Sequence, residues 1–173
     1  MWGKPLLWLA AGLLALVSAP VAAATEAQVK AAYLFKLASL VRWPQPPPGD
    51  TFRICAAGRP DIANALAQLV RNQEIGGKRV ELVQLGARNA RQASACQIMY
   101  LGGGGETAGS LMEATGRSAV LTVTDRDNGT RGGAVEFVIV DGKVRFAVNR
   151  RQAETRQLEL SAKLMDVAVE VRP

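Results

Sequence analysis

The chain has 173 residues, of which 49% are hydrophobic and 21% charged, a balance that suits one compact domain and excludes compositional disorder. It contains no histidine. A Ser-His-Asp triad, a Cys-His dyad and His-based metal sites are therefore excluded, and no other spacing of nucleophiles or paired carboxylates indicates an enzyme. We expect a protein with no catalytic residues, no metal ligands and no cofactor.

Residues 1–24 have the pattern of a cleaved export signal. A lysine precedes a short apolar run, and Ala22 and Ala24 fit the small-residue rule for cleavage. The alternative is a membrane anchor, but spanning a bilayer takes about 18 or more apolar residues and this run is shorter. The sequence therefore predicts a signal peptide at 1–24 and a soluble periplasmic product, residues 25–173.

The predicted mature chain is basic. Removing residues 1–24 takes one lysine from the 21 basic residues and leaves 20 against 15 acidic ones, a net charge of +5. The arginines are spread along the chain without a basic run or interleaved aromatic residues, so we expect a solvated basic surface and no nucleic-acid partner. Attraction to anionic lipid or to an acidic partner domain stays open.

Cys55 and Cys96 are the only cysteines. An oxidising compartment favours a disulfide between them, which would join two strand-like segments. Closing a loop of this length stabilises the fold by about 4 kcal/mol on a chain-entropy estimate. Two separately buried thiols are the alternative.

The mature chain begins with a helix signal. Thr25 and Gln28 have the spacing of a capping box, and Trp43–Pro44 ends the helical pattern. The expected apolar face carries Val29, Tyr33, Leu37, Leu40 and Val41, and it is widened by Leu34, Phe35 and Ala38. Residues 46–49, three prolines and a glycine, are expected to form a stiff connector.

Six strands are predicted from apolar and alternating runs, at 52–57, 79–85, 96–101, 119–123, 135–140 and 143–148. Helices are predicted at 60–70, with Gly76–Gly77 after it as the end signal, at 108–114, and at 158–171, where 167–171 is alternatively a terminal strand. Asp141–Gly142 predicts an antiparallel hairpin between the last two strands. The order predicts a single-domain α/β fold: a mostly parallel central sheet of about six strands with an antiparallel C-terminal hairpin and helices on both faces.

Two segments partly resemble ligand-binding motifs. Gly102–Gly105 lies between a strand and a helix, but it lacks the third glycine of a dinucleotide fingerprint and the lysine of a P-loop, so we expect a flexible strand-to-helix turn. Residues 125–129 with Glu136 partly match the sequence pattern of a calcium-binding loop. Because Thr130 stands where that loop needs glycine, we expect a solvated turn instead.

Several blocks resemble the YfiR family of periplasmic regulators. The opening helix resembles the family's at residues 29–36 and 41–44. The segments around Cys55 and from Cys96 to Tyr100 recur in the same order. The most specific blocks are Gly132–Phe137, Val144–Asn149 and Leu160–Met165. The resemblance covers about 29–171, so it is to a whole domain.

The resemblance implies a non-catalytic periplasmic protein that binds the periplasmic sensor region of an inner-membrane diguanylate cyclase and represses cyclic di-GMP production and biofilm-type behaviour. It also implies an outer-membrane lipoprotein that relieves the repression, a homodimer, and a family disulfide at Cys55 and Cys96. The chain departs from the family pattern at Gln97, where histidine often stands, and lacks a second cysteine pair near the hairpin. No residue is singled out for partner binding, and a periplasmic small-ligand-binding module or cryptic hydrolase is the alternative.

Overall fold

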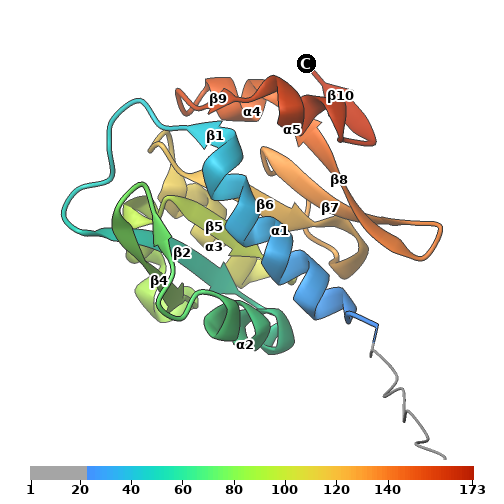
Figure 1. Cartoon of the computed structure of the whole chain (residues 1–173), viewed down its shortest axis with the longest axis horizontal. Coiled ribbons are helices and arrows are strands. Elements are labelled where there is room, and N and C mark those ends of the chain that lie inside the picture. Colours follow the sequence, from blue (N-terminus) through green and yellow to red (C-terminus); the bar gives the residue numbers. More distant parts are fainter. Residues whose placement is uncertain (1–22) are drawn as a thin grey trace, which may run out of the picture.

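The computed structural model describes residues 23–173, which form one α/β domain around an eight-stranded sheet (Figure 1). The signal-peptide prediction falls outside this range except for its last two residues. The helices are α1 (Glu26–Leu40), α2 (Pro60–Leu69), α3 (Glu106–Thr115), α4 (Arg150–Glu154) and α5 (Ala162–Asp166), with 3₁₀ segments η1 (Ala87–Ala95) and η2 (Arg126–Asn128). The strands are β1 (Val41–Arg42), β2 (Thr51–Ala57), β3 (Glu74–Ile75), β4 (Lys78–Gln84), β5 (Ile98–Leu101), β6 (Leu121–Asp125), β7 (Val135–Val140), β8 (Lys143–Asn149), β9 (Glu159–Leu160) and β10 (Glu170–Arg172). Among the described residues, no helix is long and apolar enough to cross a bilayer.

The sheet has the order β10-β8-β7-β6-β5-β2-β4-β3. Strands β4, β2, β5, β6 and β7 are parallel, and β7–β8 is the antiparallel hairpin predicted at Asp141–Gly142. All six predicted strands are present, and β3 and β10 extend the sheet at its two edges. The predicted fold class, a mostly parallel sheet with an antiparallel hairpin, is therefore confirmed.

Helices cover both faces of the sheet because its central strands are buried on both sides. Alternate residues of β2 show this: Ile54 packs in the core beneath α1 and α2, while Cys55 packs in a second core beneath α3 and η1. In Figure 1, α1 crosses in front of the sheet and α3 lies behind it. Strand β5 contributes apolar side chains to both cores, whereas β6 contributes Leu121 and Val123 to the first core alone.

The first helix begins as predicted. Thr25 caps it in a capping box with Gln28, and the helix ends at Leu40, just before the predicted stop. Within the predicted apolar face, Leu34, Leu37 and Ala38 are buried, while Val29 and Tyr33 are partly buried at the margin.

Two predictions about helices are wrong. Helix α2 ends at Leu69, and Gly76–Gly77, both at positive φ, instead forms the tight turn between β3 and β4. The closing helix predicted for 158–171 is absent, because this segment divides into β9, α5 and β10. Strand β9 pairs with β1 and Ser161 caps the short α5, so both compete with one continuous helix. The alternative of a terminal strand is partly confirmed by β10.

Candidate functional site at the strand ends

The arrangement of the parallel strands marks one crevice as the first candidate site. Strand β2 is the first of the parallel strands in sequence order, but in the sheet it lies between β4 and β5. Helix α2 leaves β2 on one face, and α3 leaves β5 on the other. In open α/β sheets, ligands bind at the carboxyl ends of the strands at such a point.

Three loops meet at these strand ends and touch one another. A Cβ atom on Gly58 would lie 2.8 Å from the backbone nitrogen of Gly103, and one on Gly104 would lie 2.8 Å from the carbonyl oxygen of Gly129. A Cβ atom on Gly102 would lie 2.6 Å from the Tyr100 ring. The predicted strand-to-helix turn at Gly102–Gly105 is therefore confirmed, and the close approach of neighbouring loops explains why it is built from glycine.

A buried ion pair occupies the crevice. Lys30 of α1, Tyr100 of β5 and Asp125 of β6 have no exposed surface. The Lys30 Nζ donates to Asp125 Oδ2 at 2.6 Å, and the Tyr100 hydroxyl donates to the same oxygen at 2.8 Å. Asp125 Oδ1 is buried without a hydrogen-bond partner in the described part of the chain. The predicted solvated turn is therefore wrong for Asp125, because α1 supplies a lysine from 95 positions earlier.

This cluster is a structural connection between α1 and the sheet. Burial, followed by the charge and hydrogen bond of Asp125, raises the pKa of Tyr100 far above its ordinary value, so its phenol stays a proton donor. Since none of the three side chains reaches solvent, a substrate would have no access to the pair. The arrangement holds α1 against the ends of β5 and β6.

A chain of charges leads from this pair to the surface. Lys30 also donates to Glu26 at 2.7 Å, and Glu26 pairs with Arg59 at 3.3 Å. Arg59 pairs with Asp61 at 2.8 Å, and its hydrogen bond lowers the pKa of Asp61 to about 2. The alternating charges link the first turn of α2 to α1 and through it to Asp125.

Glu136, considered above as a calcium ligand, is neutralised by protein groups. It is 2% exposed and accepts hydrogen bonds from the Gly132 N–H at 2.7 Å, from Arg126 at 2.6 Å and from Arg172. Burial opposes its ionisation, but these hydrogen bonds outweigh burial and lower the pKa of Glu136. Within residues 23–173, no group of acidic or cysteine side chains has the arrangement of a metal site.

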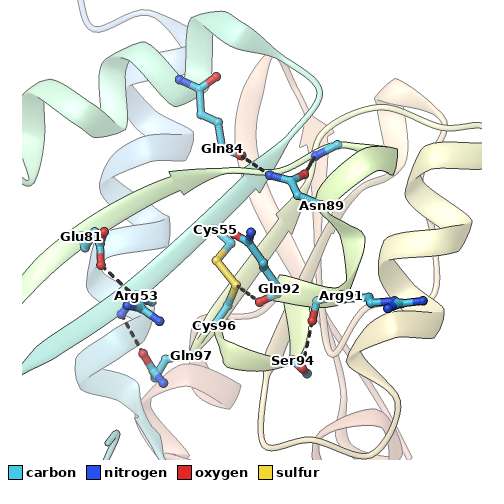
Figure 2. Close-up of a disulfide and its surroundings, with 11 residues drawn as sticks. Arg53, Cys55, Glu81, Gln84, Asn89, Arg91, Gln92, Ser94, Cys96 and Gln97 are labelled. Atoms are coloured by element: carbon cyan, nitrogen blue, oxygen red, sulfur yellow. Dashed lines mark hydrogen bonds and ion pairs between the residues drawn. A yellow bond between two sulfur atoms is a disulfide. The ribbon is translucent and has the colours of Figure 1, made fainter. Parts of the chain in front are cut away.

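The opposite ends of the strands carry the disulfide. Cys55 and Cys96 are bonded, with their Cα atoms 5.9 Å apart, and both side chains are buried (Figure 2). The bond joins the middle of β2 to the segment that enters β5. Beside it, the Gln97 side-chain carbonyl accepts the Arg53 backbone N–H at 2.7 Å, so the residue that departs from the family pattern helps to fix the same two strands.

A hollow of about 600 Å³ lies next to the disulfide, between the connector at 44–49 and the amino ends of β2 and β5. Trp43, Arg53 and Arg117 are among its lining residues. The Trp43 indole nitrogen is buried and has no acceptor in the described part of the chain. This hollow is more open to a small molecule than the crevice at the carboxyl ends, which Lys30 fills.

The sequence prediction missed Lys30, Tyr100 and the pairing of Glu136. A signal for the first was present: Lys30 stands one turn before Leu34 and two turns before Leu37, on the stripe that proves most buried. A lysine on an apolar stripe has to find a buried acid, and Asp125 at the end of an apolar strand is a suitable one.

Comparison with known proteins identifies the domain. No curated protein matches the chain. The sequence model of a family described as YfiR/HmsC-like matches residues 27–169, a range that leaves out strand β10 and the capping Thr25 and Glu26 but includes the other helices and strands described above. Membership of that family indicates a periplasmic regulatory protein, and the match extends over most of the chain. The chain belongs to the YfiR/HmsC-like family.

Proposed function

We propose that this protein is a non-catalytic periplasmic regulator that binds the periplasmic sensor region of an inner-membrane diguanylate cyclase and represses cyclic di-GMP production. The family match over residues 27–169 carries the proposal, because it covers nearly the whole of the domain. An outer-membrane lipoprotein that competes for this regulator would relieve the repression and promote biofilm formation.

Export is part of the proposal. Residues 1–24 act as a cleaved signal peptide, and residues 25–173 are the regulatory domain. Two observations support this: the α1 capping box begins at Thr25, directly after the small-residue cleavage pattern, and the disulfide suits an oxidising compartment.

The packing at the strand ends favours protein binding over catalysis. Lys30 and Asp125 pair inside the crevice where related α/β architectures place ligands, and both are fully buried. A regulator of this kind acts through its surface, by contacts that differ between the free and bound states of its partner.

The hollow beside the disulfide supports a second candidate function, a small-ligand-binding module. Its lining combines an indole with two guanidinium groups, a chemistry suited to a planar anion. A ligand that binds there would raise the melting temperature of the isolated domain without any cyclase present.

Cellular cyclic di-GMP tests the proposed function. It is measured in a deletion strain that carries either the full-length gene or a version lacking residues 1–24, with immunoblots to match protein levels. We expect a rise on deletion that only the full-length gene reverses. An unchanged level in cells that express the cognate cyclase would contradict repression, and reversal by the version without residues 1–24 would contradict a periplasmic site of action.

A further inference from the structure

The hollow beside the disulfide has the charge pattern of an anion site. Its volume of about 600 Å³ lies within the range of about 300–1,000 Å³ that small-molecule sites occupy. Arg53 and Arg117 line it, and none of its lining residues in the described part of the chain is acidic. Arg117 is exposed and forms no ion pair within residues 23–173. The lining therefore carries positive charge that no lining carboxylate balances.

Gln97 adds a directed hydrogen-bond donor to the hollow. The residue is 8% exposed, and its Oε1 accepts the Arg53 backbone N–H at 2.7 Å. Because only the oxygen of the amide can accept, this bond fixes the side chain and turns Nε2 away from that N–H (Figure 2). Nε2 has no hydrogen-bond partner among the described residues, and Gln97 lines the hollow. This nearly buried amide is therefore free to bind an acceptor that enters there.

Trp43 gives the hollow a flat apolar wall. Its ring packs edge-on against Phe52, with the ring centroids 5.3 Å apart, so the indole is held in place. Prolines of the connector at 44–49 line the hollow beside it. The indole N–H, buried without an acceptor in the described residues, is a second unmatched donor in this wall. Such a wall suits a planar apolar body attached to the charged group of a ligand.

The local charges favour a ligand with a single negative charge. Arg53 binds Glu81 through its Nε at 3.0 Å, so this carboxylate offsets one of the two guanidinium charges. The charge of Arg117 is left for the ligand. A carboxylate matches both the planar fork of a guanidinium and an amide donor. An ammonium group on the same ligand would find no acidic side chain in the lining, which disfavours free amino acids.

We propose that the hollow binds a small aromatic monocarboxylate that has no amino group. The Gln97 Nε2 group and Arg117 hold the carboxylate, and the ring lies against Trp43. This assignment rests on the second candidate function and specifies its ligand. Repression of a cyclase neither requires nor excludes it, so its test uses no cyclase.

Trp43 reports on binding by its own fluorescence. Trp2 and Trp8 lie within residues 1–24, so a protein of residues 25–173 contains Trp43 as its single tryptophan. Phenylacetate is the probe, and phenylacetamide is its neutral counterpart of the same shape. We expect phenylacetate to change the emission of Trp43 and to raise the melting temperature. It should bind about tenfold more tightly than phenylacetamide, phenylalanine or inorganic phosphate.

Two variants test the assigned contacts. Gln97→Glu keeps an oxygen for the Arg53 N–H but replaces the free donor by a negative charge, and Arg117→Gln removes the unpaired guanidinium. Each should weaken phenylacetate binding about tenfold, with an unchanged far-ultraviolet circular dichroism spectrum. Arg91→Gln is the matched control and should leave the affinity unchanged, because Arg91 is exposed and does not line the hollow.

Four results would overturn the proposal. Equal binding of phenylacetate and phenylacetamide would show a ligand module without selectivity for a carboxylate, and equal binding of phenylalanine would show that an ammonium group is accepted. Equal losses in Arg117→Gln and Arg91→Gln would show that net charge, and not the hollow, attracts the anion. No change in fluorescence or melting temperature at about 10 mM phenylacetate would show that the hollow does not bind this class of ligand. The second candidate function itself fails only if no small molecule raises the melting temperature.

Discussion

Replacing Lys30 by methionine should destabilise the domain severely. The lysine is fully buried and its Nζ lies 2.6 Å from Asp125, so the change leaves a buried carboxylate with one remaining donor, the Tyr100 hydroxyl. Removing one partner of a buried ion pair costs about 3–5 kcal/mol of the free energy of unfolding. For a domain of this size that lowers the melting temperature by about 10 °C.

Urea unfolding at pH 7 with the disulfide intact measures the effect. The matched control is Arg42→Ala, because Arg42 pairs with Glu159 at 3.4 Å on the surface, where a pair contributes about 0–1 kcal/mol. The double variant Lys30→Met with Asp125→Asn should be more stable than Lys30→Met alone, since it removes the unpaired charge and keeps an acceptor for Tyr100.

Two results would refute this reasoning. If Lys30→Met costs no more than the surface control, the buried pair does not hold α1. If the costs of Lys30→Met and Asp125→Asn simply add in the double variant, the two side chains do not interact energetically.

Three further predictions use unfolding measurements. Removing the disulfide by Cys55→Ala with Cys96→Ala should lower the free energy of unfolding by about 4 kcal/mol for a separation of 41 residues, and a loss below about 1 kcal/mol would contradict the loop-entropy account. Because the pKa of Glu136 is lowered in the folded state, the ionised side chain contributes fully to the free energy of unfolding above its unfolded pKa of about 4.3, and this contribution is lost as pH falls through the folded pKa. Glu136→Gln should therefore flatten the decline of the free energy of unfolding between about pH 5 and 3. Parallel curves of stability against pH for the variant and the unmodified protein would disprove this. Gly104→Ala should lower the free energy of unfolding by about 1–3 kcal/mol, because the added Cβ atom would lie 2.8 Å from the carbonyl oxygen of Gly129. Gly103→Ala is the control and should be near neutral, because a Cβ atom there meets nothing within 4 Å. Equal shifts of the urea midpoint in the two variants would show that crowding is not the cause.

The sheet was predictable because its strands carry strong local patterns. The runs at 119–123 and 135–140 are almost wholly apolar, and Asp141–Gly142 fixes the hairpin between β7 and β8. The last part of the chain was not predictable in the same way. Its apolar residues fit a helical period, but Gln157 adopts a positive φ and β9 pairs with β1, more than 100 positions earlier, so a long-range contact decides the local structure.

The candidate site was harder to predict for a related reason. The disulfide followed from a count of two cysteines, whereas the pairing of Lys30 with Asp125 depends on how α1 lies across the sheet. The sequence placed Asp125 next to polar residues, which indicated a surface turn, although the strand before it was correctly identified as buried. Charge pairs between distant elements leave only a weak local signal, here a lysine on an apolar helical stripe.

The separation of 95 positions between Lys30 and Asp125 also bears on how the chain acquires its structure during synthesis. A polypeptide that emerges amino end first presents α1 long before β6 exists, and until then the lysine has no buried acid to meet. The earliest helix is consequently the one whose docking must wait for a late strand. We expect α1 to close over an almost complete sheet, late in folding, because this contact joins distant parts of the sequence.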